Sequence, residues 1–178
     1  MFKIKFVKYK LIKTCKITGA KIFRPYVFKD FRGFFIENYN KKEFLKYINF
    51  KSVQNCFSFS KKNVLRGFHA EPYQDKIVSC VYGKILLVLL NIKKQSINYL
   101  KFKKILLNHK NYNLIYIPRN TGIAHLILSK EAIFNYCVNG YYSNKDQKTI
   151  LWNDKKIKIK WPIKNPILSE RDKAGYYQ

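Results

Sequence analysis

The chain has 178 residues, of which 36 are Lys or Arg and 10 are Asp or Glu, so its formal net charge is 36 − 10 = +26. Hydrophobic residues make up 47% and aromatic residues 17%, which excludes a disordered chain and predicts one domain over residues 1–178. The longest wholly aliphatic run, residues 85–90, is far shorter than the roughly 20 residues of a membrane-spanning helix, so we expect no membrane partner.

The first predicted elements lie before residue 60. Residues 22–28 read as an extended segment whose proline suits an edge strand or a strand entry, and residues 30–33 predict a turn. The clearest helix is 41–48, because Asn40 can cap it and Glu43, three residues later, can complete a capping box. Residues 53–60 then alternate apolar with polar side chains and predict a half-buried strand.

The rest of the chain reads as β structure. Short runs rich in β-branched and aromatic residues predict further strands at 77–82, 85–92, 105–107, 114–117, 125–128 and 133–138. Lysine alternates with Ile or Trp over residues 157–161, which predicts a last strand with one wet face. The predicted fold is therefore mainly β, a β-sandwich of jelly-roll type with a short helix near the N-terminus.

The cysteines and the N-terminus indicate a cytoplasmic protein. Cys15, Cys56, Cys80 and Cys137 are widely spaced, with no Cys-x-x-Cys pair, so we expect reduced, packed thiols. Residues 1–8 alternate lysine with apolar residues and do not build the continuous apolar segment of a secretory signal.

The positive charge favours an anionic partner without choosing one. Phosphate contacts from Lys and Arg supply most sequence-independent affinity for nucleic acids, which makes nucleic-acid binding a candidate function. The lysines, however, run from Lys3 to Lys173 and are not gathered in one arm or helix. We therefore expect a solvated lysine surface that attracts anions such as diphosphates, and no nucleic-acid partner.

Few residues can carry chemistry, since the chain has only three histidines: His69, His109 and His125. There is no His-x-His pair, so we expect no metal site, and there is neither a Gly-x-Ser-x-Gly elbow nor a glycine-rich phosphate loop. His69 closes a strand-like run at 64–69, and Lys76 precedes the strand at 77–82. The two side chains can project from adjacent strands into one cavity.

A collinear series of motifs resembles the sugar-nucleotide 3,5-epimerases typified by dTDP-4-dehydrorhamnose 3,5-epimerase. The matching segments are 30–37 (DFRGFFIE), Val53-Gln54, 60–69 (SKKNVLRGFH), 76–83 (KIVSCVYG), Ile117-Pro118, 122–125 (GIAH), Tyr136, 141–143 (YYS), 150–154 (ILWND), Trp161-Pro162 and 167–172 (ILSERD). The likeness extends from about Lys21 to Asp172. One such match arises easily by chance, whereas the ordered series is specific.

The resemblance implies a set of catalytic residues and no cofactor. Epimerisation beside a ketone needs a base, a group that holds the enolate oxygen, and an acid on the other face of the ring. By resemblance His69 is the base, oriented by Asp172. Lys76 lies near the enolate and Tyr136 is the acid.

The resemblance also implies a nucleotide-sugar substrate and a homodimer. The substrate-binding candidates are Arg32, Glu37, Gln54, Asn55, Arg66, His125 and Arg171. Arg32 and Arg66 suit diphosphate oxygens. Asn55 and Arg171 differ from the residues usual at their positions, and Gln147 stands where a glutamate is common, so the pocket has changed.

Two alternatives remain open at this point. Residues 70–75 form a shorter segment than in the rhamnose-pathway enzymes, and a similar short segment occurs in relatives that act on GDP-linked 4-keto-6-deoxy-heptoses for capsule sugars. The other alternative is a jelly roll that binds sugar nucleotides without catalysis. The expected role is epimerisation at C3, C5 or both of a 4-keto-6-deoxy sugar in surface-polysaccharide synthesis.

Overall fold

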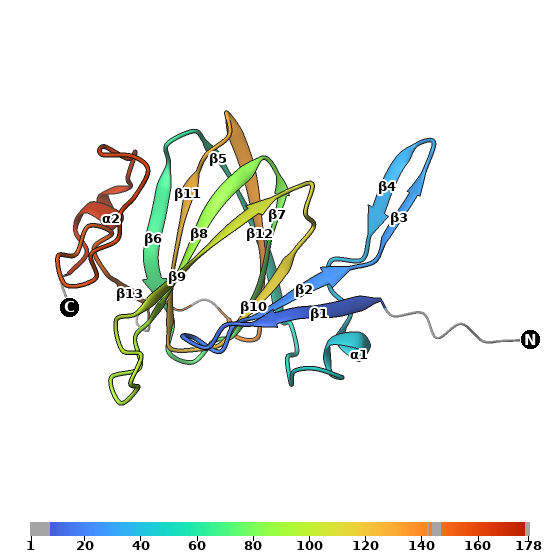
Figure 1. The fold of residues 1–178 in the computed structure, drawn as a ribbon, viewed down its shortest axis with the longest axis horizontal. Coiled ribbons are helices and arrows are strands. Elements are labelled where there is room, and N and C mark those ends of the chain that lie inside the picture. Colours follow the sequence, from blue (N-terminus) through green and yellow to red (C-terminus); the bar gives the residue numbers. More distant parts are fainter. Residues whose placement is uncertain (1–7, 142, 144–146, 177–178) are drawn as a thin grey trace, which may run out of the picture.

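The computed structural model describes residues 8–141, 143 and 147–176, and its main body is two stacked antiparallel sheets (Figure 1). The first sheet has six strands, in the order β1 (Tyr9–Thr14), β2 (Lys21–Pro25), β10 (Leu114–Ile117), β7 (Lys76–Tyr82), β12 (Glu131–Val138) and β5 (Gln54–Lys61). The second has five, in the order β13 (Lys148–Thr149), β6 (Leu65–Ala70), β11 (Thr121–Ile127), β8 (Lys84–Asn91) and β9 (Phe102–Asn108). The predicted β-sandwich is confirmed.

A hairpin of β3 (Val27–Asp30) and β4 (Gly33–Ile36) stands apart from the sandwich and projects from it in Figure 1. Its turn falls within residues 30–33, as the sequence predicts. The strands predicted between residues 53 and 138 are confirmed, with ends displaced by a few residues.

Two short helices flank the sheets. Helix α1 spans Lys41–Phe44 and is shorter than the predicted 41–48, because two tighter i to i−3 bonds follow it: Lys46 N–H to the Glu43 carbonyl at 3.3 Å and Tyr47 N–H to the Phe44 carbonyl at 2.9 Å. Asn40 caps α1 by accepting from the Glu43 N–H at 3.2 Å. Helix α2, Glu170–Lys173, lies near the C-terminus and was not predicted.

The predicted strand at 157–161 is wrong. Asp154 organises a turn there: its carboxylate accepts from Lys156 N–H at 2.7 Å, and its carbonyl accepts from Ile157 and Lys158 N–H at 3.2 Å each. Lys158 then adopts a left-handed φ of 56°, which no strand accommodates. Ile157 is nevertheless buried, so the alternation of this segment reports burial without strand pairing.

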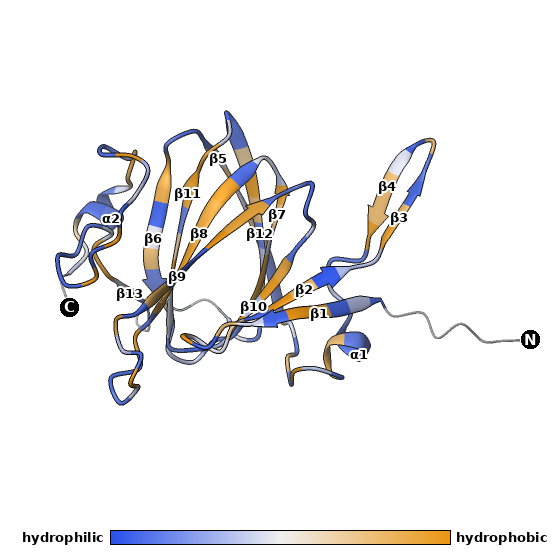
Figure 2. Cartoon of the chain, in the orientation of Figure 1, coloured by the Kyte–Doolittle hydropathy of each residue, from blue (hydrophilic) through white to orange (hydrophobic). Residues whose placement is uncertain are grey.

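The core has one layer between the sheets and one outside each of them. Aliphatic residues of β7, β8, β10 and β11 fill the space between the sheets. Residues of the C-terminal segment, including Ile150 and Trp161, pack with Phe68 and Val88 on the outer face of the five-stranded sheet. An aromatic cluster around Phe44 covers part of the six-stranded sheet. Figure 2 shows the sandwich strands as the most hydrophobic part of the chain.

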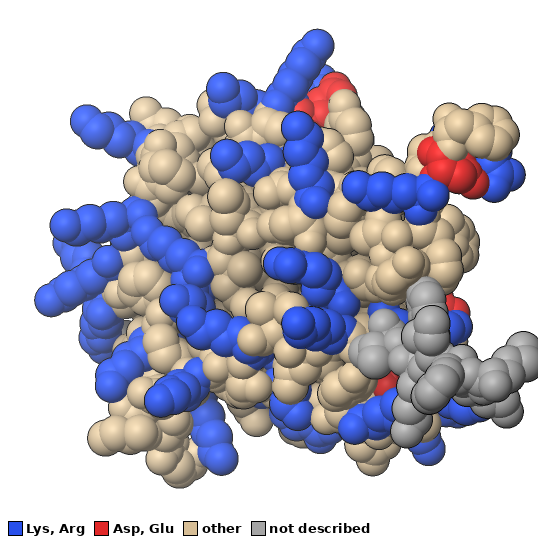
Figure 3. All heavy atoms as spheres, turned by 45° about the vertical axis from the view of Figure 1, so that its right-hand side comes forward, with Lys and Arg blue, Asp and Glu red and all other residues tan. Residues whose placement is uncertain are grey.

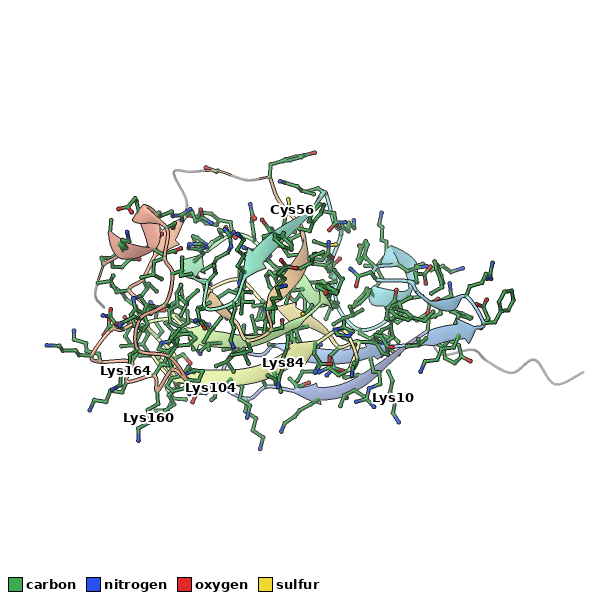
Figure 4. All side chains as sticks on the ribbon, turned by 90° about the horizontal axis from the view of Figure 1, so that it is seen from above. Lys10, Cys56, Lys84, Lys104, Lys160 and Lys164 are labelled. Atoms are coloured by element: carbon green, nitrogen blue, oxygen red, sulfur yellow. The ribbon has the colours of Figure 1, made fainter. Side chains whose placement is uncertain are left out.

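The lysine excess is spread over the surface. Figure 3 shows Lys and Arg side chains scattered over the visible face, with few carboxylates between them. In Figure 4 Lys10, Lys104, Lys160 and Lys164 lie on the side of the molecule opposite Cys56. All the cysteines are free; Cys56 is half-buried and the other three are buried. None of the helices in the described part of the chain has the length and apolarity to cross a bilayer.

Candidate active site

A cavity of about 280 Å³ opens between the two sheets. One wall comes from β5, β7 and β12, and the other from β6 and β11. The segments that follow β6 and precede β13 add Glu71, Gln74 and Gln147 at the rim. Side chains from distant parts of the sequence therefore meet in one space.

His69 stands on the β6 wall and is held by a carboxylate from α2. Its Nε2 lies 2.7 Å from Oδ1 of Asp172, whose side chain is 3% exposed. Burial opposes ionisation of Asp172, but contacts with His69, Ser169 and the Gly67 N–H outweigh it and lower the pKa of this carboxyl. In the tautomer with a proton on Nε2, His69 donates to this carboxylate and Nδ1 carries the lone pair that faces away from it.

Only glycine fits at position 67, two residues before His69. Its φ is +110°, and a Cβ there would meet the Ile123 carbonyl oxygen at 2.3 Å and Ala124 Cα at 2.8 Å, both parts of the backbone of β11. The close approach of β6 to β11 lets the Gly67 N–H donate to Asp172 at 3.1 Å. Any side chain at position 67 would separate the strands that orient His69.

Tyr136 belongs to the opposite wall, on β12, where it pairs with Cys56 of β5 and Val78 of β7. Burial raises the pKa of its phenol, and Cys56 and Glu71 raise it further, whereas Arg66 lowers it. The phenol therefore holds its proton at neutral pH. Figure 4 labels Cys56, the thiol beside this phenol.

Lys76 lies at the start of β7, on the same wall as Tyr136. Its ammonium is 5.8 Å from the centroid of the Tyr136 ring and forms an ion pair with Glu71. Its side chain is only 12% exposed. The structure thus brings the predicted base, its orienting carboxylate, the acid and the ammonium to one cavity.

Three of the predicted substrate-binding residues line the same cavity: Gln54, Arg66 and His125. Arg66 donates to the Ser60 hydroxyl at 3.0 Å. His125 is buried, and burial together with Arg66 and His69 lowers its pKa to about 3, so its ring is neutral. Among the described residues nothing hydrogen-bonds its buried Nε2, and other atoms of the residue line the cavity.

The other four predicted substrate-binding residues do not line this cavity. Arg32 lies on the β3–β4 hairpin, paired with Asp30 at 2.6 Å, and Glu37 pairs with Lys8. Asn55 lies on the outer face of the six-stranded sheet, 2.9 Å from the Asn135 amide. Arg171 is exposed and donates to Gln147, so it reaches the cavity only through that residue.

Glu71 is a charged cavity residue that sequence reasoning missed. It lies two positions after His69, just beyond the end of β6, both side chains line the cavity, and it is one of only 10 acidic residues. That spacing was the available signal. Gln147, noted from the sequence only as a substitution, lies beside it.

This arrangement defines a class of enzyme. An imidazole and a phenol face one cavity from opposite sheets, with an ammonium beside the phenol, which is an arrangement suited to removing a proton from one face of a carbon and adding one to the other. Within the described residues no three His, Cys, Asp or Glu side chains group as metal ligands. The fold and site are those of an acid–base isomerase on a β-sandwich.

Comparisons with known proteins agree with this class. A family described as dTDP-4-dehydrorhamnose 3,5-epimerase matches residues 14–177. The dTDP-4-dehydrorhamnose 3,5-epimerase of Shigella flexneri is 42% identical over 170 residues, covering 93% of each chain, and that of Salmonella typhimurium is 39% identical with the same coverage. The chain belongs to the dTDP-4-dehydrorhamnose 3,5-epimerase family.

Solved structures show the same likeness. The enzyme of that name from Bacillus anthracis, with TDP and PPi bound, has a TM-score of 0.90 and 31% identity, covering 96% of this chain and 99% of that one. A 3,5-epimerase from Legionella pneumophila in complex with dTDP-4-keto-L-rhamnose has a TM-score of 0.88 and 30% identity, covering 95% and 92%. These names do not favour the heptose alternative.

Proposed function

We propose that the chain epimerises a dTDP-linked 4-keto-6-deoxy sugar at C3 and C5, as the names of its relatives describe for those proteins. The observation that carries this proposal is the His69–Asp172 pair facing Tyr136 and Lys76 across one cavity. The presence of all four groups also speaks against a jelly roll that binds without catalysis.

Proton removal starts at His69. C3 and C5 both neighbour the C4 ketone, so a proton on either carbon is acidified by the carbonyl. Nδ1 of His69 takes that proton. The electrons of the C–H bond form a double bond to C4 of the sugar, and negative charge develops on the ketone oxygen. Asp172 stabilises the imidazolium that forms.

Lys76 and Tyr136 complete the exchange. The Lys76 ammonium stabilises the enolate oxygen, and Tyr136 donates its phenolic proton to the same carbon from the opposite face. The raised pKa of Tyr136 keeps the proton on the phenol until the carbanion is present to receive it. His69 then loses its proton and Tyr136 regains one, so substrate and product have the same composition.

Gln54, Arg66 and His125 are proposed to bind the substrate. The guanidinium of Arg66 supplies positive charge at the cavity wall for diphosphate oxygens. The neutral His125 ring forms part of the cavity wall against which the substrate lies.

Deuterium incorporation tests the reaction. The purified protein is incubated in D2O with a dTDP-linked and, separately, a GDP-linked 4-keto-6-deoxy sugar, and deuterium is located by NMR. We expect deuterium at C3 and C5 of the dTDP sugar. No incorporation, or incorporation only into the GDP-linked compound, would contradict the proposal.

We also propose that two copies of the chain associate through the outer face of the six-stranded sheet. Phe57 of β5 is 72% exposed there, and Phe31 and Phe35 of the hairpin are 98% and 65% exposed. A second cavity of about 630 Å³ lies between the hairpin and this sheet. Arg32 and Glu37 lie outside their own chain's cavity, so they can serve a substrate only in a neighbouring copy.

The assembly is tested by light scattering coupled to size-exclusion chromatography. We expect a particle of twice the 21.3 kDa chain mass, and a monomer for Phe57→Glu. A monomeric parent protein would refute the dimer.

A further inference from the structure

Glu71 is a buried carboxylate in a cavity that otherwise favours anions. Its side chain is 10% exposed, and it lines the cavity together with Arg66 and Lys76. In a chain with 36 basic and 10 acidic residues, a negative charge at this place weakens the attraction for a diphosphate. Burying it is also unfavourable unless its partners are well placed.

Both carboxylate oxygens of Glu71 have a polar neighbour. One carboxylate oxygen, Oε2, pairs with the Lys76 ammonium, and the other, Oε1, accepts from the Gln147 amide at 2.5 Å. Gln147 in turn accepts from Arg171, which also donates to Thr149 at 2.8 Å. A series of polar contacts from Arg171 through Gln147 therefore holds the Glu71 carboxylate in place.

The consequence falls on Lys76. A lysine side chain has a flexible four-carbon stem and three donors that select no direction. Here the ammonium is held between the Glu71 carboxylate and the face of the Tyr136 ring, 5.8 Å from its centroid. An ammonium beside the proposed acid can stabilise an enolate oxygen on the carbon next to the one that Tyr136 protonates.

We propose that Glu71 is a positioning residue that holds the Lys76 ammonium against Tyr136 for the enolate, with Gln147 and Arg171 as its support. This inference rests on the proposed function. It assigns Glu71 a role through Lys76 and no contact with the reacting atoms.

The first test is Glu71→Gln, which keeps the shape of the side chain and removes its charge. A displacement of about 1 Å in a catalytic group can cost on the order of 10²-fold, so we expect kcat to fall about 10- to 100-fold. Binding of dTDP, followed by titration calorimetry, should not weaken, because its diphosphate contacts remain and a negative charge has left the cavity. Glu170→Gln, at an exposed carboxylate paired with Lys173, is the matched control and should keep the parent kcat.

The second test is a cycle with Lys76→Met. If Glu71 acts through Lys76, Glu71→Gln should change kcat less than about 2-fold once Lys76 is absent. The same fold-loss in both backgrounds would overturn the proposal. Lys76→Met alone leaves the Glu71 carboxylate without its cation. The melting temperature of this single variant should therefore lie roughly several degrees below that of the double variant, a shift of the size expected for a domain of this length.

These measurements separate the two proposals. A parent protein without deuterium exchange would refute the proposed function and, with it, the role of Glu71. An active parent whose Glu71→Gln variant keeps the parent kcat would refute only the role of Glu71.

Discussion

Nε2 of His69 lies 2.7 Å from Oδ1 of Asp172, although the two residues are 103 positions apart in the chain. The contact joins strand β6 of the sandwich to helix α2. The proposed base and its carboxylate thus come from two segments that meet only when the C-terminal part of the chain packs on the five-stranded sheet.

Replacing His69 by Ala should abolish most of the proposed proton transfer. A positioned base typically contributes about 10²–10⁴ in rate, so turnover of the dTDP-linked sugar should fall by that range. The measurement is deuterium incorporation at C3 and C5 by NMR, with dTDP binding as the control for an intact cavity. Incorporation at the parent rate would exclude His69 as the base.

Tyr136→Phe should separate proton removal from inversion. His69 remains, so the carbon can still lose its proton and regain deuterium on the same face, whereas no acid serves the other face. We expect isotope exchange without change of configuration, read from deuterium content and coupling constants in one NMR series. An inverted product formed at the parent rate would mean that another group is the acid.

Asp172→Asn should affect both catalysis and stability. An amide cannot stabilise the His69 imidazolium as a carboxylate does, so kcat should fall about 10²-fold or more. Because the pKa of Asp172 is lowered on folding, its contribution to stability is present above the unfolded-state pKa and is lost as pH falls through the folded-state pKa. Denaturant unfolding at pH 7 and near pH 3 should show a smaller acid loss in the variant than in the parent.

The buried, neutral ring of His125 should lower the free energy of unfolding at mildly acidic pH, separately from Asp172. Its folded-state pKa of about 3 lies below the ordinary 6.5, so below pH 6.5 the unfolded chain takes up a proton that the folded chain refuses. Between pH 7.5 and pH 5 this amounts to roughly 2 kcal/mol. His125→Gln should remove this part of the pH dependence in urea unfolding. An identical pH dependence in both proteins would contradict a neutral, buried ring.

Periodicity predicted the strands well where pairing and burial agree. Residues 53–60 alternate because β5 has one face toward the cavity and one outward, and β12 pairs with it along its whole length. At 157–161 the same kind of alternation misled, since Asp154 and the left-handed Lys158 turn the chain while Ile157 still packs into a core. A local sequence pattern indicates which residues are buried. It does not indicate whether another strand is available to pair with the segment.

The site could be predicted only through the family resemblance. No spacing rule joins His69 to Asp172 or Lys76 to Tyr136, because those contacts follow from sheet order and from the packing of α2. The resemblance also implied Arg32 and Glu37, which lie outside this chain's own cavity. It was silent about Glu71, whose contacts with Lys76 and Gln147 appear only in three dimensions.

The late position of Asp172 has a consequence for synthesis. Both cavity walls are encoded by residue 138, so a growing chain has produced the base, the acid and the ammonium well before the carboxylate emerges. A ribosome-bound intermediate can therefore close its sandwich while the imidazole still lacks its anchor. His69 gains its carboxylate partner only when helix α2 packs beside β6.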